Sequence, residues 1–152
     1  MRHRRPALIG VAALLTAVTV ACSGSGSPSP SRPAQTSGPS GAAVRIEVKL
    51  TDAFKIEPAA IDVKAGVPVT FVVTNSGVLE HEFFVGSEAE QAAHEKEMVG
   101  GPMAHDEPTG IGVKPGATKE LTMTFPAPGT TIAGCHIPGH YVAGMKAAIT
   151  IQ

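Results

Sequence analysis

Short stretches in which apolar and polar residues alternate recur along the chain from Val44 onward. Val44 to Leu50 reads VRIEVKL, and Ile61-Asp-Val-Lys repeats the same period of two. Successive side chains of a strand point to opposite faces, so this pattern predicts strands with one buried and one solvated face. Further strand-like segments, bounded by Pro or Gly turns, are 67–74, 81–85, 111–113, 119–125, 130–133 and 146–151. So many short strands predict an all-β sandwich or barrel.

One segment departs from the strand pattern. Ser87-Glu-Ala-Glu90 has the form of a capping box, in which the serine caps a helix and the glutamate reaches back to it. The helix is expected to run from about Glu88 to Met98, where Gly100-Gly-Pro102 stops it. The domain is therefore expected to carry one short helical insertion.

The first residues have the layout of an export signal. Three arginines precede an apolar run of about 15 residues, Ala7 to Ala21. A helix needs about 20 apolar residues to span a bilayer. Residues 1–21 are therefore predicted to be a signal peptide of an exported protein rather than a permanent transmembrane helix.

Cys22 lies directly after the predicted signal. It follows Val-Thr-Val-Ala and precedes Ser-Gly-Ser-Gly-Ser, which resembles a bacterial lipoprotein cleavage box, although Thr19 departs from the usual Leu or Val. We predict that Cys22 is lipidated and anchors the protein to the extracytoplasmic face of the cell membrane, with plain secretion as the alternative. Residues 22–43 are rich in Ser, Gly and Pro and are predicted to be a flexible linker.

The remaining segment, 44–152, has the length of one small domain. The signal holds three of the 12 Lys and Arg residues and none of the 13 Asp and Glu residues, so its removal leaves a formal charge of −4. A mildly acidic domain gives no reason to expect nucleic-acid binding.

Cys135 has no disulfide partner if Cys22 is lipidated, and an unpaired cysteine in an exported protein points to a reactive thiol, an intermolecular bridge or a metal ligand. The string Cys135-His-Ile-Pro-Gly-His140-Tyr-Val-Ala-Gly-Met145 places a thiolate, an imidazole and a thioether in one loop. Such donors favour copper over magnesium or calcium, and two histidines, a cysteine and a weak axial methionine describe a blue-copper site.

The second histidine is expected to be His81, because it opens a strand just after a turn. His94 and His105 fall in the predicted helix and the loop after it, and His136, as the neighbour of Cys135, is expected to point away from the site. The predicted metal ligands are His81, Cys135, His140 and Met145.

Two motifs together, Asn75-x-Gly77-x₃-His81-Glu-Phe and Cys135-x₄-His140-x₄-Met145, resemble the cupredoxin family, which includes plastocyanin, azurin and rusticyanin. The resemblance covers essentially all of 44–152. It implies a Greek-key β-sandwich with one copper ion per chain, which cycles between Cu(I) and Cu(II) on the four predicted ligands. It also implies that Asn75 braces the two copper-bearing loops by hydrogen bonds from outside the ligand set.

The expected function is a monomeric one-electron carrier outside the cytoplasmic membrane, with transient redox partners docking near His140. The alternative is a protein that sequesters or delivers copper. An enzyme is disfavoured because a copper oxidase or nitrite reductase needs a second type of copper centre. A binuclear centre is disfavoured because position 139 is Gly where a second cysteine would fall.

A second group of soft donors surrounds the predicted helix. His94 and Met98 share a helical face, and Met103 and His105 follow in the loop, which suggests an auxiliary Cu(I) site or a docking flap. A solvated helix and loop with scattered donors is the competing interpretation. Glu80 and Glu82 flank His81 and are expected at the surface or bonded to backbone, since alternation points them away from the imidazole.

Overall fold

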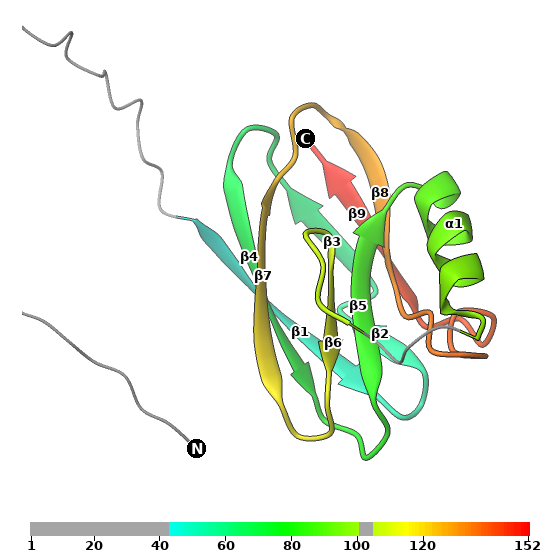
Figure 1. The fold of residues 1–152 in the computed structure, drawn as a ribbon. Coiled ribbons are helices and arrows are strands. Elements are labelled where there is room, and N and C mark those ends of the chain that lie inside the picture. Colours follow the sequence, from blue (N-terminus) through cyan, green and yellow to red (C-terminus); the bar gives the residue numbers. More distant parts are fainter. Residues whose placement is uncertain (1–42, 101–104) are drawn as a thin grey trace, which may run out of the picture. The chain divides into compact units, whose positions relative to one another are not determined.

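Two β-sheets stacked face to face form the domain in the computed structural model, which describes residues 43–100 and 105–152 (Figure 1). The first sheet has the strand order β2-β1-β4-β7, and the second has the order β3-β9-β8-β5-β6. The first sheet comprises β1 (Val44–Thr51), β2 (Lys55–Glu57), β4 (Pro68–Asn75) and β7 (Thr118–Thr124). The second comprises β3 (Ala60–Val63), β5 (His81–Gly86), β6 (Gly110–Val113), β8 (Gly129–Gly134) and β9 (Lys146–Ile151).

The chain crosses between the sheets at the β2–β3, β3–β4, β4–β5, β6–β7 and β7–β8 connections. Strand β1 pairs with β4 in parallel, as β3 does with β9, and the other pairs are antiparallel. The all-β Greek-key sandwich expected from the sequence is confirmed.

The core lies between the sheets and is built from the apolar positions of the alternating pattern. Val48 and Leu50 of β1 are buried while their neighbours along the strand are more exposed. Phe71 of the first sheet meets Phe83 of the second, with ring centroids 5.3 Å apart, and neither ring is exposed. Each such side chain contributes roughly 1.5–3 kcal/mol by leaving water, so these contacts fix how the two sheets stack.

Most predicted strands agree with the structure to within one or two residues. Strand β2 was not predicted, because it has three residues and a single buried side chain, Ile56, which gives no readable alternation. It pairs with the end of β1 and completes one edge of the first sheet.

The predicted helix is confirmed as α1 (Glu88–Met98), with Ser87 as its N-cap and both hydrogen bonds of the capping box to Glu90 present. The helix lies against β5 and β8 on the outer side of the second sheet (Figure 1). Its contact is partly polar, because the buried Gln91 Nε2 lies 2.7–3.3 Å from the carbonyl oxygens of Phe84, Gly86 and Ile132. Because α1 packs on β5, residues next to His81 on that strand are buried beneath the helix.

No helix within the described ranges has both the length and the apolar character that crossing a membrane requires. The predicted signal peptide, the linker and Cys22 all lie outside the described residues.

Candidate metal centre

The loop between β8 and β9 carries three of the predicted donors. Its two ends are joined by a hydrogen bond from the Cys135 N–H to the Met145 carbonyl, 3.2 Å, and the Met145 N–H donates to the His140 carbonyl, 3.0 Å. Gly139 and Gly144 adopt φ angles of 90° and 94°, a region that side chains disfavour. The backbone therefore fixes all three positions beside one another at the end of the sandwich.

His81 opens β5, and its ring faces this loop. His81 Nδ1 lies 3.3 Å from His140 Nδ1, which in turn lies 3.4 Å from Cys135 Sγ. The three donor atoms lie within 4.8 Å of one another. His81, Cys135 and Met145 are fully buried, and His140 is 8% exposed. The structure thus brings His81 to Cys135 and His140, which lie more than 50 residues later in the sequence, and buries Met145 at the end of the loop that carries these two.

A transition-metal ion fits these donors. Metal–nitrogen bonds of about 2.0–2.1 Å set at 120° place two nitrogen donors about 3.5 Å apart, close to the 3.3 Å between the two histidine Nδ1 atoms. Two neutral imidazoles and a thiol would gain little from such a convergence by themselves, whereas a soft or borderline cation satisfies all three.

The protonation states of Cys135 and His140 decide how each side chain would bind a metal. Burial raises the pKa of the Cys135 thiol to about 11. A hydrogen bond from the Glu82 N–H, 3.3 Å from the sulfur, favours the thiolate and opposes part of this rise. Burial, and then the nearby His81, lower the pKa of His140, so its imidazole is neutral at pH 7. His140 would bind a metal as a neutral imidazole, and Cys135 would release its thiol proton to bind as a thiolate.

Asp52 is a functional residue that the sequence analysis missed. Its Oδ1 lies 3.1 Å from His81 Nε2, the ring nitrogen opposite the one that faces the metal site. The carboxylate also accepts hydrogen bonds from the backbone N–H groups of Val78, 2.8 Å, and Leu79, 3.2 Å. The Val78 hydrogen bond is the largest cause of its lowered pKa. Asp52 thus fixes the His81 ring and adds a negative charge beside it.

Gly77 makes room for this carboxylate. A Cβ atom at position 77 would collide with Asp52 Oδ1. The parallel register of β1 and β4, in which Leu50 is opposite Asn75, brings Asp52 beside Gly77 just beyond the strand ends. The contact follows only from this strand pairing, and for that reason the sequence alone did not predict it.

Asn75 is fully buried and holds the loop before His81. Its Nδ2 donates to the carbonyls of Leu79, 2.7 Å, and Val113, 2.9 Å, and its Oδ1 accepts from the Gly77 N–H, 2.9 Å. Val113 pairs with His81 across β5 and β6. In the described part of the chain, no side-chain hydrogen bond joins Asn75 to the Cys135–Met145 loop. Asn75 therefore braces the first metal-bearing loop against β6, and the expected brace to the second loop is not formed.

Glu82 differs from the surface position expected for it. It is fully buried because α1 covers that face of β5. Its Oε2 accepts a hydrogen bond from the backbone N–H of His136, 3.1 Å, which agrees with the other expectation, a backbone partner. Its Oε1 lies 3.0 Å from His94 Nε2. His136 itself points away from the donors and bonds to Gln91, 2.6 Å.

The predicted auxiliary donors are only partly described. Met98 packs in the hydrophobic core, and Met103 lies outside the described residues. The rings of His94 and His105 have centroids 6.1 Å apart. The groups nearest His94 are carboxylates, those of Glu82 and Glu107.

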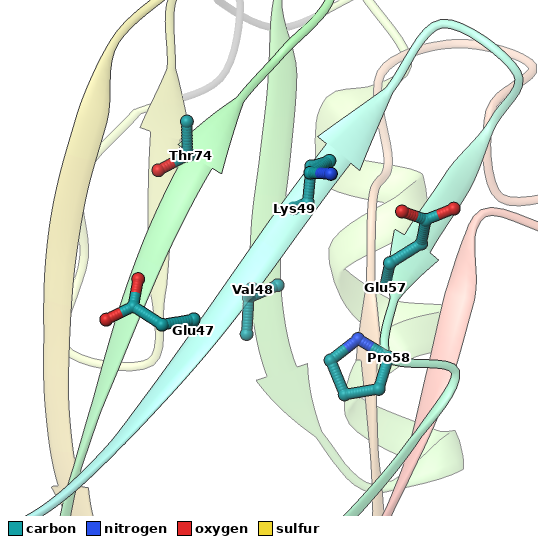
Figure 2. A pocket seen from close by; sticks show the side chains of 6 residues that line it. All are labelled: Glu47, Val48, Lys49, Glu57, Pro58 and Thr74. Carbon is teal, nitrogen blue, oxygen red and sulfur yellow. The ribbon is translucent and has the colours of Figure 1, made fainter.

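A surface hollow of about 500 Å³ lies on the first sheet, away from these donors (Figure 2). It is lined by Glu47, Val48, Lys49, Glu57, Pro58 and Thr74, and it holds none of the predicted metal ligands. The predicted ligands lie instead at the end of the sandwich where His81 and the β8–β9 loop meet.

Solved structures with the same fold include two auracyanins. The dithionite-reduced auracyanin of Roseiflexus castenholzii has a TM-score of 0.65 at 27% identity and covers 74% of this chain and 99% of its own. Auracyanin A, a "blue" copper protein of Chloroflexus aurantiacus, has a TM-score of 0.62 at 26% identity and covers 72% and 99% of the two chains.

Relatives by sequence point to the same metal. The copper-resistant cuproprotein CopI of Pseudomonas aeruginosa is 38% identical over 137 residues, with 70% of this chain and 75% of the relative covered. The protein of the same name from Rubrivivax gelatinosus is 37% identical over 108 residues, with 70% and 66% covered. Residues 42–152 match the model of the copper binding proteins of the plastocyanin/azurin family. The chain belongs to this family of cupredoxins, and copper is its cofactor.

Proposed function

We propose that the protein is a type 1 mononuclear copper protein that carries single electrons outside the cytoplasmic membrane. His81, Cys135, His140 and Met145 are its proposed ligands. The observation that carries the proposal is the buried group of two imidazoles and one thiol already gathered within 4.8 Å. Copper held there supplies a one-electron couple between Cu(I) and Cu(II).

A rigid donor set favours electron transfer, because little rearrangement then accompanies a change of oxidation state. Backbone hydrogen bonds hold the loop, Asp52 holds the His81 ring, and Asn75 holds the segment before it. These contacts belong to the protein and do not depend on the charge of the metal.

His140 is the proposed port for electrons. It is the only one of the four proposed ligands with any exposed area, 8%, and the Phe54 ring lies 4.7 Å from its own. Small and apolar residues that lie exposed near it in the loop are Pro138, Gly139, Val142 and Ala143. We propose that transient redox partners dock on this surface, since an apolar patch without charge allows brief, weakly oriented contacts.

Asp52→Asn is expected to raise the reduction potential. The carboxylate stabilises the more positive oxidation state, and asparagine removes this charge. Its single oxygen can keep the contacts of Oδ1 with the Leu79 N–H and His81 Nε2, while the hydrogen bond from the Val78 N–H to Oδ2 is lost. For one electron, each tenfold change in the ratio of oxidised to reduced protein corresponds to about 59 mV, and we expect a shift of this order. A redox titration followed by visible absorbance measures it. Asp62→Asn, an exposed carboxylate on β3, is the control. An equal shift in both variants, or none in Asp52→Asn, would count against the role of Asp52.

Copper sequestration or delivery is the second candidate function. The observation that favours it is the name of the sequence relatives, which are copper-resistant cuproproteins. For either role we propose an extracytoplasmic location, with Cys22 as the lipid anchor.

The two roles predict opposite outcomes when a competing chelator is added. A carrier keeps its copper through repeated chemical oxidation and reduction, because loss of the metal ends its function. A delivery protein loses Cu(I) to a chelator within minutes and regains it from a donor. We expect tight retention through at least several redox cycles, measured as recovered visible absorbance in the presence of a Cu(I) chelator. Rapid loss of the metal in the reduced state would favour delivery.

A further inference from the structure

Three carboxylates converge on one buried imidazole beneath α1, outside the proposed copper site. His94 Nε2 lies 3.0 Å from Glu82 Oε1, and His94 Nδ1 lies 3.4 Å from Glu107 Oε1 and 3.9 Å from Glu97 Oε2. The His94 side chain is 2% exposed and Glu82 is fully buried. Donor atoms of Glu82, His94 and Glu107 lie within 4.8 Å of one another.

The charges of this group are not balanced by the protein. A protonated histidine supplies one positive charge against three carboxylates. Among the described residues, no lysine or arginine forms an ion pair with Glu82, Glu97 or Glu107. Glu82 is fully buried, whereas the Glu107 and Glu97 side chains are 26% and 74% exposed. A buried anion is costly unless it is paired or coordinates a metal, and the partly buried Glu107 adds a further negative charge that a cation would balance.

The two nitrogens of the His94 ring have different partners. A carboxylate oxygen only accepts hydrogen bonds, so Nε2 carries the proton donated to Glu82, and in the neutral ring Nδ1 then offers a lone pair to a cation. Histidines that ligate metals donate their other N–H to a carboxylate in this manner, which fixes the ring. The ring is fixed further by stacking on Phe84, with centroids 4.1 Å apart and the planes 6° from parallel.

The Nδ1 side has the features of an open binding site. Glu107 Oε1 is buried and has no hydrogen-bond partner, because its approach to Nδ1 is not aligned as a hydrogen bond. A surface pocket of about 220 Å³ is lined by His94, Glu97 and Glu107, among others. Metal bonds of about 2.0–2.2 Å place ligand atoms about 3.3–3.6 Å apart in a tetrahedron, close to the observed 3.4 Å, and the exposed Glu97 side chain can shorten its 3.9 Å.

We propose that His94 Nδ1, Glu97 and Glu107 form a second metal site for a divalent transition-metal cation, with Glu82 orienting the histidine. One imidazole and two carboxylates suit borderline ions such as Zn²⁺ and do not suit Cu(I), which prefers sulfur. The donor set therefore differs from the thioether-containing Cu(I) set expected from the sequence. The site is independent of the redox role proposed above.

Zinc binding to protein already loaded with one equivalent of copper tests the proposal. We expect one zinc ion per chain in equilibrium dialysis and metal analysis, while the visible copper band keeps its intensity and shows that zinc has not replaced copper. Glu107→Gln is expected to weaken zinc binding roughly tenfold or more. Glu97→Gln, at an exposed position where folding is not at stake, is expected to weaken it less.

Glu88→Gln is the matched control, because it removes the same charge from an exposed position of the same helix. It should leave zinc binding unchanged. The proposal is overturned if the copper-loaded protein takes up no zinc, or if Glu107→Gln and Glu97→Gln both bind zinc as the unmodified protein does. Because the copper band is read in the same samples, a defect at the copper site is distinguished from a defect at the zinc site.

Discussion

Cys135→Ser is expected to abolish the intense visible absorption of the copper-loaded protein. The colour of a blue-copper site requires the thiolate sulfur, and serine offers only a hard oxygen that stays protonated at neutral pH. Copper affinity is expected to fall by more than about 100-fold, since ligands matter more than the outer-shell groups whose loss costs 10- to 100-fold. Titration with Cu(II), followed by absorbance and by competition with a chelator, measures both effects.

Met145→Leu is the comparison for this experiment. It removes the proposed axial donor, leaves the three close donors in place and keeps a side chain of similar volume in a fully buried position. The coloured site should survive with a shifted band. An unchanged band in Cys135→Ser would refute the assignment of the thiolate.

Asn75→Ala is expected to lower the free energy of unfolding by about 2–4 kcal/mol. The substitution removes three hydrogen bonds and leaves the carbonyls of Leu79 and Val113 and the N–H of Gly77 without their partner. Each buried group left unsatisfied costs about 1–3 kcal/mol, and partial relaxation of the loop reduces the sum. Urea unfolding of the copper-free protein, followed by circular dichroism, gives the value.

Ser76→Ala provides the scale for that measurement. Ser76 Oγ makes one hydrogen bond, 3.0 Å, to the Leu50 carbonyl at the same turn, and position 76 is exposed. Its loss should cost about 0.5–1.5 kcal/mol. Equal losses in the two variants would show that Asn75 does not hold the turn in the way described.

The elements that the sequence predicted well are those whose signal is local. The alternation in β1, the capping box at Ser87 and the spacing of Cys135, His140 and Met145 each need only a few neighbouring residues. Choosing His81 needed one further assumption, that a histidine opening a strand faces the loop, and the structure places its ring there.

The parts that the sequence did not predict depend on which elements become neighbours. Asp52 approaches His81 only through the parallel pairing of β1 with β4, and Glu82 is buried only because α1 returns over β5. The helical pattern of the sequence does not predict that Gln91 will contact three carbonyl groups of the second sheet. Such contacts arise from tertiary structure, which alternation and motif spacing do not encode.

The hydrogen bonds that close the β8–β9 loop bear on when the protein acquires its metal. The ladder between the two strands ends at Gly134 and Lys146, and the bond from the Cys135 N–H to the Met145 carbonyl extends it by one step. The backbone of the loop is thus held by the chain itself. Hydrogen bonds of this kind lower the conformational entropy that the donors lose when they bind a metal. We therefore expect the copper-free chain to complete its fold first and to bind copper afterwards without a large rearrangement of this loop.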